Sequence, residues 1–414
     1  MKRRTKRRNK GKKRFNFPHA LLDGAISTVL VFIVFVIAPY IFNFGIIKAY
    51  WDSMSDFKVS DIGFSQLVDP NYAKGDTNIV IFNIRDMDNA ALSQLVMSLN
   101  ANKPRIIGIN KVIKKENSIY DSVLAFAFKN VDHLVLASRF YQDTTTNQYD
   151  IIDRSDEMFL INASTGYSNL LFDRNQYNST VRDFYPTYKL NLSTEYLFSV
   201  KVALAYNPKS VERLLTEENK KTINWEEYRK FLSITNVSDL GNSLEAYSFV
   251  RDKIVLLGVY DSESDPNDNH YYLDDKYFTP INPNYAGRTY PDMFETDIHA
   301  NIISMILEDN YLYVAPAWLN YLFSVVFCFL VMILYIYIKY RIDPWYELLT
   351  VVIFFIFSAS ILLITIYSIH WYSFDLQINE ALLALAISSP VFEAYYQSIK
   401  VIFLKIYKSK RRKT

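Results

Sequence analysis

The chain has 414 residues, a formal net charge of +2 and a single cysteine, and half of its residues are hydrophobic. One cysteine excludes an intramolecular disulfide, so a folded domain must be held by its hydrophobic core. The charges are uneven: residues 1–14 hold ten Lys or Arg and residues 400–414 hold seven, without an acid in either segment, whereas residues 43–316 hold 26 basic and 37 acidic residues. With the clustering of apolar residues, this favours one large domain joined to membrane segments over several soluble domains.

The first apolar segment follows a basic N-terminus, residues 1–19, and covers residues 20–42. As a helix it spans roughly 34 Å, enough to cross a bilayer. A signal peptide is the competing interpretation, but the apolar run is too long and no small-residue cleavage site follows it. We therefore predict a transmembrane signal anchor. Asp23 lies near the predicted membrane interface, where we expect its carboxylate to reach water.

The large domain, residues 43–316, begins with alternating strand and helix patterns. Short apolar runs predict strands, and the intervening segments have the 3.6-residue spacing of helices that pack on a core; in chain order these are 79–85, 91–100, 105–113, 121–130 and 133–138. This β-α-β-α-β order predicts an α/β fold, a mixed sheet with parallel pairs and flanking helices.

The rest of the domain has fewer clear periods. Residues 140–250 are rich in Asn, Asp, Thr and Tyr and predict short strands and hairpins, apart from a helix over 195–207. A buried strand is expected over 251–261, with Gly258 permitting close approach of backbone or ligand. The last predicted helix, 295–310, begins at a cap formed by Thr296 or Asp297.

Three further apolar segments form a predicted membrane cluster over residues 317–402, followed by a basic tail, 403–414; the segments are 319–338, 348–369 and 381–402. The third contains Glu393, so an amphipathic helix on the inner surface is its alternative. Loops and termini rich in Lys and Arg stay in the cytoplasm by the positive-inside rule. With four crossings, this rule places both termini in the cytoplasm and residues 43–316 outside. Glu393 would be costly in lipid and is expected to pair with another helix inside the membrane.

The basic N-terminus could in principle bind nucleic acid, as similar runs do in soluble proteins. Beside a signal anchor we interpret it as a topology signal attracted to anionic membrane lipid, and no nucleic-acid partner is expected.

Several strings, taken in their order along the chain, resemble a type-2 CHASE domain, the extracellular sensory domain of cyclases and histidine kinases. They are YWDSMSDFKVSDIGFS, IVIFNIRDMDNAALSQLV, PRIIGIN with DSVLAFA, KIVLLG, the Thr279–Pro280 pair and DIHANIISMIL. The resemblance implies a sensor whose membrane helices flank the domain. Two positions depart from the family pattern. Asn110 stands where the family often has Asp, and the segment MFETDIHA stands where a Pro-Gly pair is common. We expect no attached cytoplasmic effector, and therefore a separate membrane or cytoplasmic signalling partner and, by analogy, a homodimer.

Polar residues gather where the predicted parallel strands end. Because the carboxyl ends of parallel strands meet at one edge, where open α/β sheets place ligands, we predict a ligand pocket there. Its residues are Asn83, Arg85, Asp86, Asp261, Thr279 and His299, with Gly258 at the same edge. The alternative is that these groups cap strands and satisfy buried backbone.

Metal and catalytic signals are weak. Asp261, Asp265 and Asp268 could bind calcium, but their spacing does not follow the EF-hand pattern, and a solvated loop is the simpler interpretation. His299 could sense pH or bind a metal, although a single helical His is more often a structural hydrogen-bonding group. No catalytic motif is found, so we expect no enzyme, no cofactor and no metal site.

We therefore interpret the sequence as a sensor of the bacterial inner (cytoplasmic) membrane that binds an unknown ligand or protein. A non-signalling structural or docking component of an envelope or transport complex is the alternative.

Overall fold

The computed structural model describes residues 17–41, 58–68, 73–142, 149–170, 180–190, 193–216, 220–241, 243–260, 276–282 and 291–402. It divides into two compact units. The first, Asp61–Tyr313, is called the α/β unit below. The second, the helical unit, is formed by the flanking segments Met1–Ser60 and Val314–Thr414.

The centre of the α/β unit is a sheet with the strand order β10-β1-β11-β2-β3-β5, in which all neighbouring strands are parallel. These strands are β1 (Lys74–Asn83), β2 (Ile106–Ile109), β3 (Leu134–Tyr141), β5 (Ala163–Tyr167), β10 (Arg229–Ile234) and β11 (Ile254–Gly258). A seventh strand, β4 (Ile151–Asp153), pairs antiparallel with the end of β3. The predicted mixed sheet with parallel pairs is confirmed.

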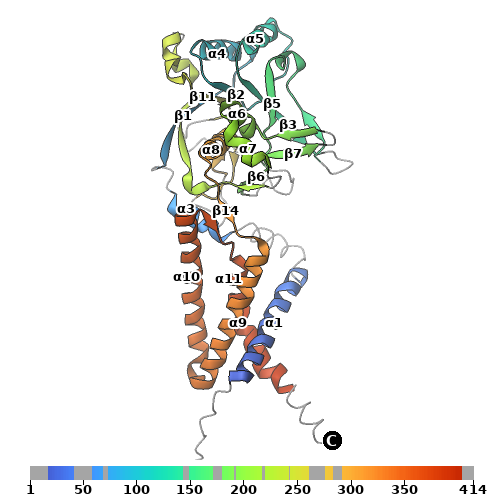
Figure 1. Cartoon of the computed structure of the whole chain (residues 1–414), viewed down its shortest axis with the longest axis vertical. Coiled ribbons are helices and arrows are strands. Elements are labelled where there is room, and N and C mark those ends of the chain that lie inside the picture. The colour runs from blue at the N-terminus through green and yellow to red at the C-terminus, as the bar shows by residue number, and fades with distance from the viewer. Residues whose placement is uncertain are drawn as a thin grey trace, which may run out of the picture. The chain divides into compact units, whose positions relative to one another are not determined.

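Helices cover both faces of this sheet (Figure 1). Because side chains alternate along a strand, Val80 and Phe82 pack with α4 (Asn89–Ala101) and α5 (Ile119–Lys129). Ile79 and Ile81 point the other way and pack with helices α6 (Phe198–Tyr206) and α8 (Glu295–Glu308). Burial on both faces is why the central strands are continuous apolar runs instead of alternating patterns.

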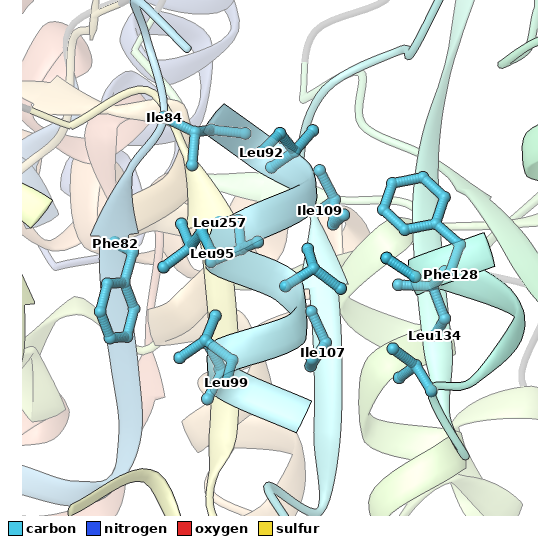
Figure 2. Packing of buried hydrophobic residues seen from close by; sticks show 14 of the residues in the cluster. Phe82, Ile84, Leu92, Leu95, Leu99, Ile107, Ile109, Phe128, Leu134 and Leu257 are labelled. Carbon is cyan, nitrogen blue, oxygen red and sulfur yellow. The ribbon is translucent and has the colours of Figure 1, made fainter. Parts of the chain in front are cut away.

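Figure 2 shows how closely one of these faces is filled. Leu92, Leu95 and Leu99 of α4 lie over the side chains of β1, β11 and β2, and each is at most 3% exposed. The spacing of these residues is the helical period that the sequence predicts. The helix begins where the carboxylate of Asp88 accepts a hydrogen bond from the backbone N–H of Ala91 at 2.8 Å.

The segment between β3 and β11 contains short elements, as expected. Beyond the main sheet these are α7 (Pro208–Thr216), β6 (Asp183–Phe184), β7 (Thr187–Leu190), β8 (Ser193–Tyr196), β9 (Lys221–Thr222) and the 3₁₀ turns Glu157–Phe159, Trp225–Glu227, Val237–Leu240 and Leu244–Val250. The strands β7 and β8 form a hairpin, and β6 pairs with β9. The sequence did not indicate that β5 and β10 would extend the central sheet.

Helix α8 begins differently from the prediction. The expected cap at Thr296 or Asp297 is wrong, because Phe294 takes the N-cap position without a side-chain bond and Glu295 starts the helix. The hydroxyl of Thr296 instead donates to the carbonyl oxygen of Val259 at 3.2 Å. Two acidic side chains in the first turn, Glu295 and Asp297, stabilise the positive end of the helix dipole.

The short strands β12 (Lys276–Tyr277) and β13 (Met293–Phe294) pair with each other in the α/β unit. The helix α3 (Val59–Leu67) belongs to this unit from Asp61 onward. Within this unit the guanidinium of Arg182 binds the Asp61 carboxylate through two hydrogen bonds.

The helical unit contains α1 (Phe17–Ile41), α9 (Ala317–Arg341), α10 (Tyr346–Tyr372) and α11 (Asn379–Ala394), with the 3₁₀ turn Asp343–Trp345 and the short strand β15 (Phe374–Asp375) at the connections. The short strand β14 (Tyr313–Val314) spans the point in the chain where the two units divide. Three segments are long and apolar enough to cross a membrane: Phe17–Ala38, Ala317–Arg341 and Asp343–Tyr372. The predicted signal anchor and the first two C-terminal segments are thus found as apolar helices. A fourth crossing is not among these spans.

The last helical segment is irregular. Pro390 lies inside α11, and a π-helical turn, Tyr395–Ile399, follows directly. Asp23 of α1 is only 9% exposed; it accepts a hydrogen bond from the Tyr395 hydroxyl at 2.7 Å and forms an ion pair with Lys400. Its carboxylate therefore does not simply reach water, as the sequence suggested. Glu393 is partly buried, and its proposed role in helix pairing stays a prediction.

Candidate ligand site at the carboxyl edge of the sheet

The predicted edge is formed by three neighbouring strands. Asn83, the last residue of β1, lies in register with Gly258, the last residue of β11. On the other side of β11, the backbone N–H of Asn110 donates to the carbonyl oxygen of Leu257 at 2.7 Å. The Asn83 side chain accepts from the backbone N–H groups of Arg85 at 3.1 Å and Tyr260 at 3.3 Å. The structure thus brings Asn83 and Gly258 together and adds Asn110 beside them.

Gly258 is required by the close approach of α8. A Cβ atom built at this position would lie 2.1 Å from Oγ1 of Thr296 and 2.9 Å from its Cγ2. Such a distance is far inside van der Waals contact, so any other residue requires the Thr296 side chain or the helix to move. The glycine therefore seats the first turn of α8 against the end of β11.

Charged side chains meet beside this first turn. Arg139 of β3 forms an ion pair with Oε2 of Glu295, and Oε1 of Glu295 lies 3.8 Å from Nε2 of His299, one helical turn further on. Glu295 is 8% exposed and His299 is fully buried. Burial alone would raise the pKa of Glu295, but the charge of Arg139 and the nearby His299 outweigh it and lower that pKa below its usual value. The carboxylate is thus ionised at neutral pH.

His299 is held by both ring nitrogens. Nε2 donates to the carbonyl oxygen of Ser168 at 3.1 Å, and Nδ1 is 2.6 Å from the hydroxyl of Ser199. The Phe198 ring packs edge-on against the imidazole. With both nitrogens engaged, the arrangement fits the structural alternative for His299 better than metal ligation.

One buried acceptor near this edge, Oδ1 of Asn110, has no hydrogen bond within the part of the chain that the structure describes. Oε1 of Glu295 has only longer contacts, with Nε2 of His299 at 3.8 Å and with the Ser168 side chain. An unsatisfied acceptor in a protein interior is costly, and it is usually explained by a bound water, ion or ligand that donates to it. The edge is therefore chemically suited to a ligand that carries N–H or O–H donors.

A second polar cluster surrounds Thr279. The carboxylate of Asp292 accepts from the backbone N–H of Thr279 at 2.8 Å, from its hydroxyl, and from the Asn282 side chain at 3.2 Å. Burial nevertheless raises the pKa of Asp292 to about 6. Desolvation also raises the pKa of the partly buried Asp297 to about 7.

The predicted pocket is therefore brought together only in part. Asn83 lies at the edge with Gly258; Arg85 follows it, and Asp86 is exposed. His299 and Thr279 belong to the two networks described above, whereas the predicted Asp261, Asp265 and Asp268 lie outside the described residues. In the described residues no group of three or more potential metal ligands occurs.

Sequence reasoning missed Arg139, Glu295 and Ser199. The spacing of Glu295 and His299, four residues apart on one helix face, was a usable signal for their proximity. Arg139 follows the predicted strand 133–138 directly, but nothing local shows that its partner lies on α8.

The chain matches one known protein family. The sequence profile of the CHASE2 domain matches residues 56–335. No curated protein and no solved structure matches the chain significantly. The matched region contains the whole parallel sheet, α8 and the first part of α9. The profile covers more than half of the chain, which therefore belongs to the CHASE2 family of extracellular sensory domains.

Proposed function

We propose that the protein is a membrane-anchored sensor, not an enzyme, in which the carboxyl edge of the sheet binds a ligand and the helices pass the change to a separate membrane or cytoplasmic partner. The observation that carries this proposal is the network in which the partly exposed Arg139 of β3 meets the buried Glu295 and His299 of α8. That helix ends at Glu308, and the membrane helix α9 begins at Ala317. A shift in the first turn of α8 thus has a short covalent route to the membrane.

The chemistry of the edge supports a ligand that donates hydrogen bonds. Glu295 binds Arg139 through Oε2, whereas its Oε1 has only longer contacts with His299 and Ser168. An N–H or O–H group placed there would gain a charge-assisted bond, which is about twice as strong as a neutral one. Because Glu295 opens α8, such a bond would act on the helix directly.

Four membrane crossings complete the proposal, with residues 381–402 as the last. Two contacts within the helical unit support it: Ala315, just before α9, donates its backbone N–H to the Asp375 carbonyl at 2.9 Å, and Tyr335, near the other end of α9, bonds Ser388 at 3.2 Å. The segment thus runs parallel to α9 over most of its length, as expected for two crossings separated by the intervening helix α10. Its end, Lys400, reaches Asp23 near the start of α1.

The charge pattern sets the proposed orientation in a bacterial inner membrane. The basic clusters in residues 1–14 and 400–414 would remain in the cytoplasm, beside anionic lipid, and the α/β unit would lie outside. Reporter fusions after residues 14, 310, 340 and 414 test this directly. We expect an outside signal only at 310, and an outside signal at 414 would refute the fourth crossing.

The sensing role is tested by tagging the full chain and comparing what co-purifies with it from native membranes under different growth conditions. We compare the wild type with Glu295→Gln, which keeps the shape and removes the charge of the network. The control is Asp153→Asn at the exposed Lys114–Asp153 pair.

For a sensor, the amount of co-purifying partner changes with conditions in the wild type and in the control, and stays fixed in Glu295→Gln. Stoichiometric recovery that is the same in all three proteins and all conditions would instead identify a structural docking component. That result would overturn the sensing role.

A further inference from the structure

An apolar stripe lies on the outer face of α5. Ile119 is 77% exposed, Val123 37% and Phe126 63%. Their spacing of four and three residues places them on one side of the helix, within one continuous stripe. Tyr120, also exposed, flanks the stripe. The opposite side of α5, with Leu124 and Phe128, is the side that packs on the sheet.

A further exposed apolar residue lies in the loop next to the end of the helix. The side chain of Asn162 donates to the carbonyl oxygens of Lys129 at 3.2 Å and Val131 at 2.9 Å, which fixes this loop beside the last turn of α5. The preceding residue, Ile161, is 71% exposed. We call the group formed by Ile119, Tyr120, Val123, Phe126 and Ile161 the α5 surface.

Single exposed apolar side chains are ordinary, but a contiguous group on one rigid element marks an interaction site. Helix α5 is fixed in the fold by Asp121, whose carboxylate accepts from the Asn89 side chain at 2.8 Å and from the backbone of Ser118 at 3.2 Å. The α5 surface is therefore presented by a well-ordered helix.

We propose that the α5 surface binds the same surface of a second copy of this chain, with the two α5 helices antiparallel about a two-fold axis. Such a contact is self-complementary. An antiparallel register that sets Ile119 against Phe126 of the other copy brings Ser122 next to the axis and Glu116 opposite Lys129. Both Glu116 and Lys129 are exposed.

The charges of Glu116 and Lys129 favour a second copy of this chain over another protein or a lipid surface. The acid lies before the start of α5 and the base lies in its last turn, so the two-fold axis forms the Glu116–Lys129 pair twice. Antiparallel helix dipoles add to the attraction. A parallel arrangement would place like charges side by side.

The contact is small. One helix face buries much less than the roughly 800 Å² per partner of a typical stable complex, so we expect weak association in dilute detergent. Two chains held in one bilayer have a high effective concentration, which makes a weak contact sufficient. The dimer is thus expected to depend on the membrane.

Cysteine cross-linking in membranes tests the geometry. In a Cys328→Ser background of the full chain, Ser122→Cys places a thiol next to the proposed axis, and mild oxidation should give a covalent dimer. The matched control is Lys209→Cys on α7, which is also exposed but lies on a different helix. Equal cross-linking at both positions, or none at 122, would overturn the proposal.

A charge exchange tests the register. Adding Glu116→Lys or Lys129→Glu to the Ser122→Cys chain puts like charges together at two places in each homodimer, so cross-linking should fall about tenfold. Co-expression of the two single variants gives a heterodimer in which both pairs are attractive again, and the cross-link should return.

This mixed experiment separates association from folding. Glu116 also accepts a hydrogen bond from the backbone of Asn89 at 3.0 Å, so its variant could lose some stability. That loss persists in the mixture and would not be rescued. Failure of the mixture to restore the dimer, or an unchanged cross-link in Phe126→Glu, would show that another partner or the lipid surface covers α5.

Discussion

Arg182 and Asp61 form a buried bidentate ion pair in the α/β unit: Nε lies 2.9 Å from Oδ1 and Nη2 lies 2.6 Å from Oδ2. The side chains are only 10% and 5% exposed. A charge left alone in such a place is costly, whereas replacing both partners by apolar residues can be nearly neutral. The pair fixes α3 to the segment that precedes β6.

Replacement of Arg182 by Met is therefore expected to lower the free energy of unfolding by about 3–5 kcal/mol. The double variant with Asp61→Leu should recover most of the loss, because no buried charge remains. Urea unfolding followed by tryptophan fluorescence measures both, since the buried Trp225 donates to the carbonyl oxygen of Val181 at 3.1 Å, next to the ion pair. A single variant within about 1 kcal/mol of the wild type would contradict this prediction.

The contact between Gly258 and Thr296 gives a second prediction. Gly258→Ala should destabilise the α/β unit by about 1–3 kcal/mol, because its Cβ overlaps the Thr296 side chain. The double variant with Thr296→Ala removes the overlapping atoms and should be more stable than Gly258→Ala alone. The control is Gly75→Ala in β1, where nothing lies within 4 Å of the added Cβ. Equal losses at the two glycines would contradict the close approach of α8.

The π-helical turn in the helical unit has a specific consequence for Asp23. In a regular α-helix, residues five apart lie about 140° apart around the axis. Here the backbone N–H of Lys400 bonds the carbonyl oxygen of Tyr395, so these two residues lie on one face and both reach Asp23. Such bulges often occur at functional positions.

Deletion of Gln397 removes the extra residue of the turn and leaves Lys400 four residues after Tyr395 in a regular helix, about 40° around the axis, so its ion pair with Asp23 is kept. In unfolding of the full chain by sodium dodecyl sulfate, we expect the deletion to cost much less than Lys400→Met, which leaves the Asp23 charge alone at a cost of about 3 kcal/mol. The comparison variant is Lys339→Met, whose partner Asp343 is 69% exposed. A deletion that destabilises the chain as much as Lys400→Met would contradict this account of the turn.

The raised pKa of Asp292 predicts a pH dependence of stability. Its pKa is 3.8 when unfolded and about 6 when folded, so between these values the folded state binds more protons than the unfolded state. Stability therefore falls as the pH rises from about 4 to about 6, and this contribution is constant outside that window.

The Asp292→Asn variant lacks this contribution. The melting temperature of the wild type relative to that of the variant should decrease from pH 4 to pH 6 and then level off, as measured on the full chain in detergent. The neighbouring Glu295, whose pKa is lowered, acts in the opposite direction in both proteins and cancels in the difference. A difference that is constant across this range would show that Asp292 has an ordinary pKa.

The central strands could be predicted because their residues are buried on both faces, which leaves continuous apolar runs such as Ile254–Gly258. The strand β5, with the sequence Ala-Ser-Thr-Gly-Tyr, carries no such run. Its place is set by Gly166, where a Cβ would lie 2.8 Å from the backbone of Phe198 in α6. A packing requirement of this kind is visible only once the two elements are together.

The candidate site also contains residues that the sequence could place and residues that it could not. Asn83 and Gly258 could be expected at one edge because parallel strands end together. Arg139 and Glu295 are 156 residues apart, and their pairing depends on how α8 crosses the sheet. The partners of Asp23 lie further still along the chain, so hydropathy identified the helix but could not identify what its acid binds.

The position of β11 has a consequence for biogenesis. It lies between β1 and β2 in the sheet, although it follows both by more than a hundred residues. The early β-α-β segment cannot close its sheet before β11 arrives, and contacts of such long sequence separation form slowly. In the proposed topology, the first half waits on the far side of the membrane with an open strand edge. That edge is available to chaperones and proteases until β11, Ile254–Gly258, has been translocated.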